Sequence, residues 1–158
     1  WTIHGLWINY CNGSWYCPMD TPLPTNNITK LLLDNNKTDL VKDMMHYWNP
    51  DEDYNNLWLH ELKKHASCMS TIQPSCYDDD AVRGWIDYFE STVQLYLKYP
   101  IFDVLKAHGI LPGYYYSTDS IKDALFSTWN ITLSLQCEEN ILSEVFLYFH
   151  AIVSNFIN

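Results

Sequence analysis

The spacing of apolar residues predicts helices through the middle of the chain. Residues 80–99 carry apolar side chains three and four apart, which is typical of a helix with one buried face. The buried side of this predicted helix comprises Trp85, Tyr88, Phe89, Val93 and Tyr96. Further helices are predicted over about 39–48 and 54–66, after Pro100, and after Ser117 or Thr118.

Strand-like alternation of apolar and polar residues occurs near both ends of the chain. It covers residues 1–7, 131–137 and 144–153. Residues 10–38 are rich in Pro, Asn and Gly and predict a loop. With 158 residues, no repeat and no linker, the chain fits one α+β domain over residues 1–158.

The most informative segment is residues 57–68, which read LWLHELKKHASC. On a helix, each residue advances about 100°, so His60 and Lys64 are nearly eclipsed. Glu61 and His65 follow one step around the surface, and all four are predicted to project from one flank within an arc of roughly 140°. The packed side of the helix is predicted to hold Leu57, Trp58 and Leu62.

A second segment, residues 1–7 with the sequence WTIHGLW, contributes another imidazole at His4. Two histidines that exchange a proton beside a cation suit metal-free cleavage of a phosphodiester through the ribose 2′-hydroxyl. An imidazole pKa near 6.5 lets one ring be neutral and another charged in mildly acidic solution. Glu61 is expected to favour the charged forms of His60 and His65.

A zinc site is the main alternative, because His60 and Glu61 begin like the H-E-x-x-H motif of metalloproteases. Here Lys64 occupies the position of the second zinc ligand, and its ammonium repels a metal. His65 lies five residues after His60, and this helical spacing turns the two imidazoles apart. No metal or cofactor is therefore expected, while a metal-dependent hydrolase stays open as a hypothesis that EDTA tests.

These motifs resemble those of the T2 ribonucleases, which are secreted RNases of eukaryotes. The family's first motif is approximately (F/W)-T-I-H-G-L-W-P, and residues 1–7 match it. The second is approximately (F/W)-W-x-H-E-W-x-K-H-G-T-C, and residues 57–68 follow it with changes. Residues 70–76 and 109–112 also resemble the family. The resemblance implies a central antiparallel β-sheet flanked by helices.

The resemblance also implies a role for each ionisable residue. His65 is the expected general base toward the 2′-hydroxyl, and His4 is the expected general acid toward the leaving 5′-oxygen. His60 would hold the phosphate, while Glu61 and Lys64 would stabilise the charged transition state. The expected product is a 2′,3′-cyclic phosphate that is later hydrolysed to the 3′-phosphate. DNA lacks the nucleophile and is not an expected substrate.

Substrate contacts and departures from the family motifs complete this prediction. The expected substrate-binding residues are Trp7, Asn9, Trp15 and Leu57. Stacking on tryptophan tolerates any base. The departures are Ile8 for Pro, Leu62 for Trp, Ala66 for Gly and Ser67 for Thr. Ala66 would matter if the glycine that it replaces needs a backbone conformation that alanine resists.

The five cysteines form an odd set. The resemblance implies a disulfide between Cys17 and Cys68, which would tie the two motifs together. It also implies partners for Cys11, Cys76 and Cys137 that this sequence does not contain. We therefore expect the domain to be truncated at both ends relative to the full-length protein.

Composition agrees with a secretory protein. Four N-x-S/T sequons begin at Asn12, Asn27, Asn36 and Asn130. We expect a glycosylated protein that is extracellular, or vacuolar or lysosomal by the secretory pathway. No run of residues is long and apolar enough to span a membrane.

The formal net charge of −10 excludes a general polyanion binder. It leaves an enzyme that grips one or two nucleotides of single-stranded RNA through local cations and works at acidic pH. The expected state is a monomer. The open alternative is a catalytically weak or inactive secreted ribonuclease-like binding protein.

Overall fold

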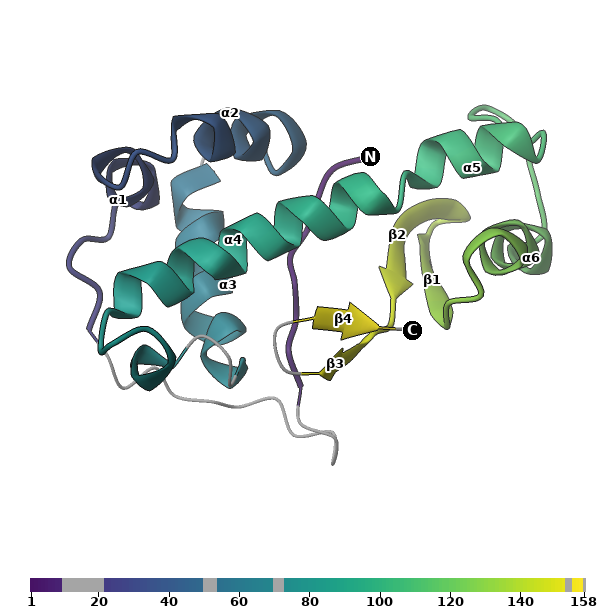
Figure 1. Ribbon diagram of the computed structural model, residues 1–158. Coiled ribbons are helices and arrows are strands. Elements are labelled where there is room, and N and C mark those ends of the chain that lie inside the picture. The colour runs from purple at the N-terminus through teal and green to yellow at the C-terminus, as the bar shows by residue number, and fades with distance from the viewer. Residues whose placement is uncertain (10–21, 50–53, 70–72, 153–154, 158) are drawn as a thin grey trace. The chain divides into compact units, whose positions relative to one another are not determined.

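The computed structural model describes residues 1–9, 22–49, 54–69, 73–152 and 155–157 (Figure 1). The chain divides into two compact units, Trp1–Tyr99 and Pro100–Asn158. Within the described ranges, no helix combines the length and the apolar character that a bilayer crossing requires.

The described part of the first unit is helical. Its elements are α1 (Ile28–Asp34), α2 (Thr38–Tyr47), α3 (Tyr54–Lys64), the 3₁₀ helices η1 (Ala66–Cys68) and η3 (Pro74–Cys76), and α4 (Ala81–Lys98). The helices predicted over 39–48, 54–66 and 80–99 are confirmed as α2, α3 and α4. Asp80 starts α4 as its N-cap, where the side chain accepts a hydrogen bond from the Val82 amide at 3.1 Å.

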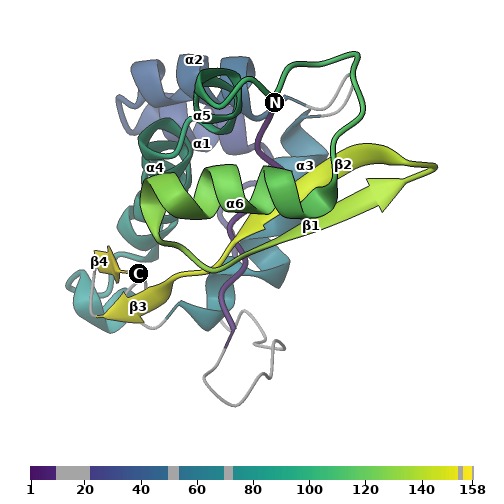
Figure 2. The same ribbon diagram turned by 90° about the vertical axis from the view of Figure 1, so that its right-hand side faces the viewer.

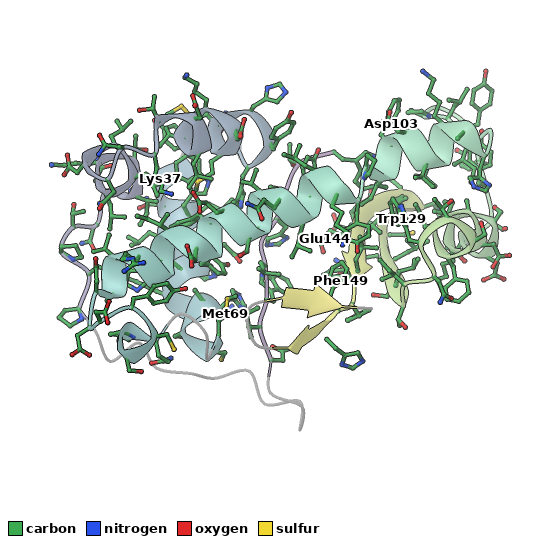
Figure 3. The ribbon with its side chains drawn as sticks, in the orientation of Figure 1. Lys37, Met69, Asp103, Trp129, Glu144 and Phe149 are labelled. Atoms are coloured by element: carbon green, nitrogen blue, oxygen red, sulfur yellow. The ribbon has the colours of Figure 1, made fainter. Side chains whose placement is uncertain are left out.

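Aromatic side chains fill the core of the first unit. The predicted buried side of α4 is confirmed for Trp85, Tyr88, Phe89 and Val93, of which Tyr88 and Phe89 are fully buried, whereas Tyr96 is half-buried. Phe89 packs against Trp48, with ring centroids 5.9 Å apart. The Trp58 indole donates to the Trp48 carbonyl at 2.8 Å, which joins α3 to the end of α2. At the start of α2, Lys37 pairs with Glu90 of α4 at 2.6 Å (Figure 3).

The prediction of a loop over residues 10–38 is wrong for α1. Asn27 caps this helix, and its side chain accepts from the Lys30 amide at 2.8 Å. The buried residues of the helix are Ile28, Leu31 and Leu32. Their spacing of three and four is helical, but only seven residues long and surrounded by loop-forming residues.

The strand predicted over residues 1–7 is also wrong, because this segment pairs with no strand among the described residues. It runs past the helices of its unit as an isolated chain (Figure 1). The Ile3 amide donates to the Tyr47 carbonyl at 2.7 Å, and the Tyr96 hydroxyl donates to the Trp1 carbonyl at 2.6 Å. Helices therefore supply hydrogen bonds that the sequence pattern assigns to a sheet.

The second unit contains helices and antiparallel strands. Its elements are α5 (Ile101–Ala107), α6 (Thr118–Trp129), β1 (Leu133–Glu138), β2 (Ile141–Leu147), β3 (His150–Ile152) and β4 (Asn155–Ile157). Strand β1 pairs with β2, and β3 pairs with β4, both antiparallel. The two predicted helices are confirmed, as is the strand over 131–137. The predicted strand over 144–153 is divided between β2 and β3.

One face of the β1–β2 pair carries the core of the second unit. Helix α6 lies against β1 (Figure 2). Leu125 is fully buried, and Trp129 (Figure 3) packs with Leu133 and Val145 against the same cluster. The predicted α+β class is confirmed, with a mostly helical chain and a small antiparallel component.

Candidate active site

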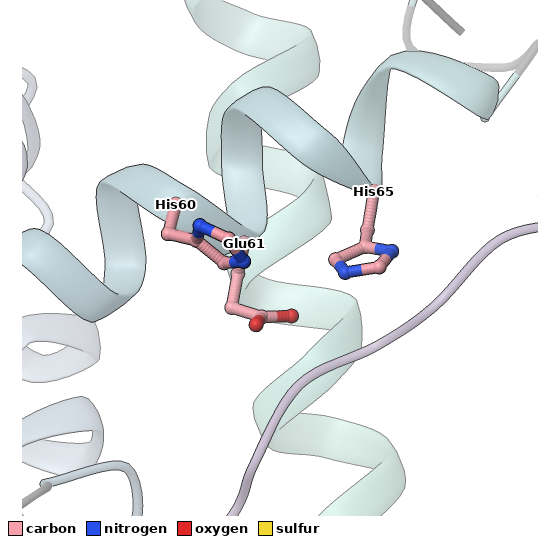
Figure 4. Close-up of side chains that lie close together, drawn as sticks. All are labelled: His60, Glu61 and His65. Carbon is pink, nitrogen blue, oxygen red and sulfur yellow. The ribbon is translucent and has the colours of Figure 1, made fainter. Parts of the chain in front are cut away.

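The second histidine segment forms the end of α3, and the helix stops inside the motif. The His65 amide makes the final helical hydrogen bond to the Glu61 carbonyl at 3.0 Å, after which the chain tightens into η1. His65 is thus the first residue after α3 and the N-cap of η1. Its ring centroid lies 6.2 Å from that of His60 (Figure 4). The prediction that i+5 spacing turns these imidazoles apart is wrong, because the angle expected between the two side chains applies only where the helix continues through both residues.

The side chains of His60, Glu61 and His65 converge (Figure 4). One ligand atom from each lies within 4.8 Å of the others, so these three could hold a metal ion. Two imidazoles and a carboxylate are a donor set that zinc accepts. The predicted divergence of the two imidazoles therefore no longer counts against a metal ion, whereas the neighbouring Lys64 ammonium still repels a cation.

The predicted single flank of ionisable groups divides into a buried and an exposed half. Glu61 is 1% exposed and His65 is 7% exposed. His60 and Lys64 are exposed. The motif thus lies where α3 passes from the core to the surface, and the two halves are solvated differently.

Trp7 joins the first motif to the second. Its indole Nε1 donates to Oε2 of Glu61 at 2.9 Å. The indole stacks on His65 with ring centroids 5.1 Å apart and an angle of 19° between the planes. His4 meets the same indole edge-on, also at 5.1 Å. The two predicted proton-transfer histidines therefore contact one aromatic ring.

Burial shifts the pKa of the two buried groups, Glu61 and His65. Desolvation raises the pKa of Glu61, against the lowering effects of the Trp7 hydrogen bond and of nearby His4 and Lys64. The pKa of His65 is lowered to about 4, chiefly by desolvation and in addition by Lys64, His60 and His4. The expectation that Glu61 favours the charged form of His65 is wrong, because burial and three cationic neighbours dominate. Nδ1 of His65 is buried and has no hydrogen-bond partner among the described residues.

Two anchors hold the backbone of the first motif, and sequence reasoning missed both. The Trp48 indole donates to the His4 carbonyl at 2.8 Å. The buried Tyr88 hydroxyl donates to the Leu6 carbonyl at 2.9 Å. Of the two donors, only Tyr88 is predicted from the sequence, and only as a packing residue. Their side-chain N–H and O–H groups were the available signal, since a buried Trp or Tyr needs a partner.

The remaining predicted substrate residues are Asn9, Leu57 and Trp15. Asn9 is exposed, and Leu57 is half-buried on α3. Trp58 and Leu62 are fully buried, so the predicted packed side of α3 is confirmed for them. The predicted site residue Trp15 lies outside the described residues.

Ala66 raises no conformational difficulty. It is fully buried in η1 and is absent from the described residues that have a positive φ. The backbone there suits an L-residue, so replacing the family's glycine costs no left-handed strain.

The predicted covalent sites are distributed as follows. Cys68 is buried in η1, and Cys76 and Cys137 are exposed. Asn27, Asn36 and Asn130 are exposed. Cys11, Cys17 and Asn12 lie outside the described residues.

Comparisons with known proteins agree over the whole chain. The model of the Ribonuclease T2 family matches residues 1–158. A Ribonuclease T2-like protein of Emericella nidulans is 36% identical over 95% of this chain and 37% of its own length. Ribonuclease T2 of Aspergillus oryzae is 35% identical over 98% of this chain and 58% of its own length. The chain thus spans about four to six tenths of these relatives.

A solved structure gives the same result for the fold. The crystal structure of Actibind, described as a T2 ribonuclease, is 34% identical, covers 94% of this chain and 65% of its own, and superposes with a TM-score of 0.83. Since the family model covers every residue that carries the two histidine motifs, and the fold agrees, the chain belongs to the Ribonuclease T2 family.

Proposed function

We propose that this protein is an endoribonuclease that cleaves single-stranded RNA by metal-independent transesterification. The observation that carries the proposal is the meeting of His4 and His65 on one indole. Each imidazole lies 5.1 Å from the Trp7 ring, one edge-on and one stacked. Two imidazoles from separate motifs are thus held together, as an acid and a base acting on one phosphodiester require.

His65 acts as the general base. It takes the proton of the ribose 2′-hydroxyl, and the 2′-oxygen attacks phosphorus. The pKa of about 4 keeps this imidazole neutral in mildly acidic solution, where a histidine of ordinary pKa would be largely protonated. His4 then protonates the departing 5′-oxygen, which leaves a 2′,3′-cyclic phosphate and a free 5′-hydroxyl. Water opens the cyclic phosphate to the 3′-phosphate in a second step with the proton transfers reversed.

The other three ionisable groups surround the phosphoryl oxygens. His60 and Lys64 are exposed beside the buried pair and carry positive charge toward the developing negative charge. Glu61 lies on the buried side of the site and helps to stabilise the charged transition state. The local cations offset a net charge of −10, so binding is confined to the scissile phosphate and its neighbouring bases.

The same proposal covers the protein's covalent features and its partners. Cys68 is disulfide-bonded and buried, which supports a bridge to Cys17. Exposed sequons at Asn27, Asn36 and Asn130 are consistent with glycosylation in the secretory pathway. We propose a monomer that acts on RNA and not on DNA.

A metal-dependent hydrolase is the second candidate. It is favoured by the convergence of His60, Glu61 and His65 to within 4.8 Å. Chelation separates the two candidates, because transesterification by imidazoles proceeds in EDTA.

The test uses the full-length, oxidised protein with a short RNA and its 2′-deoxy counterpart, at mildly acidic pH with EDTA. We expect a 2′,3′-cyclic phosphate from the RNA alone, identified by mass. His4→Ala and His65→Ala should each lower the rate by about 10²–10⁴-fold. His46→Ala, an exposed histidine on α2, is the matched control. Intact RNA from folded protein would favour the ribonuclease-like binding protein, and loss of activity in EDTA would favour the metal enzyme.

A further inference from the structure

Trp7 contacts more of the site than a base-stacking residue requires. Its Nε1 hydrogen bond reaches the carboxylate of Glu61, and its ring contacts the imidazoles of His4 and His65. A nucleobase platform needs only an open ring face. The indole N–H is therefore committed to the protein, and its acceptor is a predicted catalytic carboxylate.

Gly5 provides the room for this contact. A Cβ at position 5 would lie 2.6 Å from Cδ of Glu61 and 2.9 Å from Nε1 of Trp7. Real Cβ atoms essentially never approach so closely, so the Glu61 carboxylate, which accepts from the Trp7 indole, would have to shift. The φ of Gly5 lies outside the left-handed region. The requirement for glycine here is thus steric, because the carboxylate occupies the space of a side chain.

The backbone on both sides of Gly5 is fixed. Trp48 holds the His4 carbonyl, and Tyr88 holds the Leu6 carbonyl. The segment therefore cannot easily retreat from an added methyl group. A displaced carboxylate would instead lose the indole N–H, and a buried carboxylate without a partner is unfavourable.

We propose that Gly5 and Trp7 are positioning residues for Glu61, with Gly5 leaving space for its carboxylate and Trp7 fixing the carboxylate by a hydrogen bond. The inference rests on the proposed ribonuclease function and adds to it. It assigns the first motif a role toward the second that is distinct from binding a base. Neither residue is assigned a proton-transfer step.

The first test is Trp7→Phe, which keeps an aromatic face and removes the N–H. We expect kcat to fall about tenfold, as for loss of one hydrogen bond to a charged group, with little change in KM. Losing the donor also raises the pKa of Glu61, so the acidic limb of the pH profile moves to higher pH. In a Glu61→Gln background the same change should no longer move the acidic limb, since the amide at this position does not titrate. A change in KM and base preference with an unaltered kcat would overturn the inference.

The charged and titratable groups around Glu61 must be followed in the same profile. They are His4, His60, Lys64, His65 and Tyr88. A shift that persists in the Glu61→Gln background would belong to these groups and would count against the inference.

The second test is Gly5→Ala, with Gly109→Ala as its control. The control adds a methyl group in open space at a φ of +76° in the second unit, so it strains the backbone without meeting a neighbouring atom. We expect Gly5→Ala to reduce kcat at least tenfold in folded protein, and Gly109→Ala to keep the kcat of the wild type. Equal kcat values for the two variants would contradict the steric role of Gly5.

A readout independent of catalysis separates this inference from the proposed function. In ¹⁵N-labelled protein, the indole resonance that disappears in Trp7→Phe should shift with pH as Glu61 titrates, and should lose that shift in Glu61→Gln. A wild-type protein that cleaves no RNA but shows this titration keeps the Trp7–Glu61 contact and refutes the ribonuclease proposal. Active protein whose Trp7 indole does not titrate refutes the positioning role.

Discussion

Acidification should destabilise this protein through His65. The folded protein lowers the pKa of His65 from 6.5 to about 4, mainly because the side chain is only 7% exposed. The unfolded chain therefore binds this proton more tightly than the folded one. The stabilising contribution is complete above about pH 6.5 and is lost as the pH falls toward 4.

The magnitude follows from the two pKa values. The pKa of His65 is 6.5 in the unfolded chain and about 4 in the folded protein. This difference lowers the free energy of unfolding by about 3 kcal/mol between pH 7 and pH 4. About two thirds of this loss should be present at pH 5. The raised pKa of Glu61 acts in the opposite direction, because it favours the folded state at low pH.

The assay is urea unfolding of the wild type and of His65→Gln between pH 4 and pH 8. Subtracting the two curves removes contributions that they share, including most of that from Glu61. The difference should change by about 3 kcal/mol across the range, and His46→Gln on the exposed face of α2 should leave the wild-type pH dependence intact. Parallel curves for the wild type and His65→Gln would refute the claim that burial holds this imidazole neutral.

Two further changes test the anchors of the fold. Tyr88→Phe removes the hydroxyl that holds the Leu6 carbonyl and should cost about 1 kcal/mol of unfolding free energy; an unchanged urea midpoint would show that this anchor contributes no stability. Asp80→Ala removes the cap of α4 and should cost about 1 kcal/mol, whereas Asp80→Asn should restore most of it; equal loss in both variants would contradict a capping role.

The sequence by itself determined the elements whose signals are local. The apolar stripe of α4 lies within twenty residues, and the structure confirms the helix. The two motifs likewise indicate His4, His60 and His65 as candidate site residues. Local patterns were insufficient for α1, because its cap and its buried residues span only a short segment. They were also insufficient for residues 1–7, which alternate like a strand but form hydrogen bonds with helices.

Tertiary structure alone decided how the site is arranged. The hydrogen bond from Trp7 to Glu61 joins residues 54 positions apart, and no spacing rule anticipates it. Helix α3 ends at Lys64, and the His65 ring lies near that of His60 and stacks on Trp7. Sequence identifies ionisable groups, but their protonation depends on the solvent that the rest of the fold excludes.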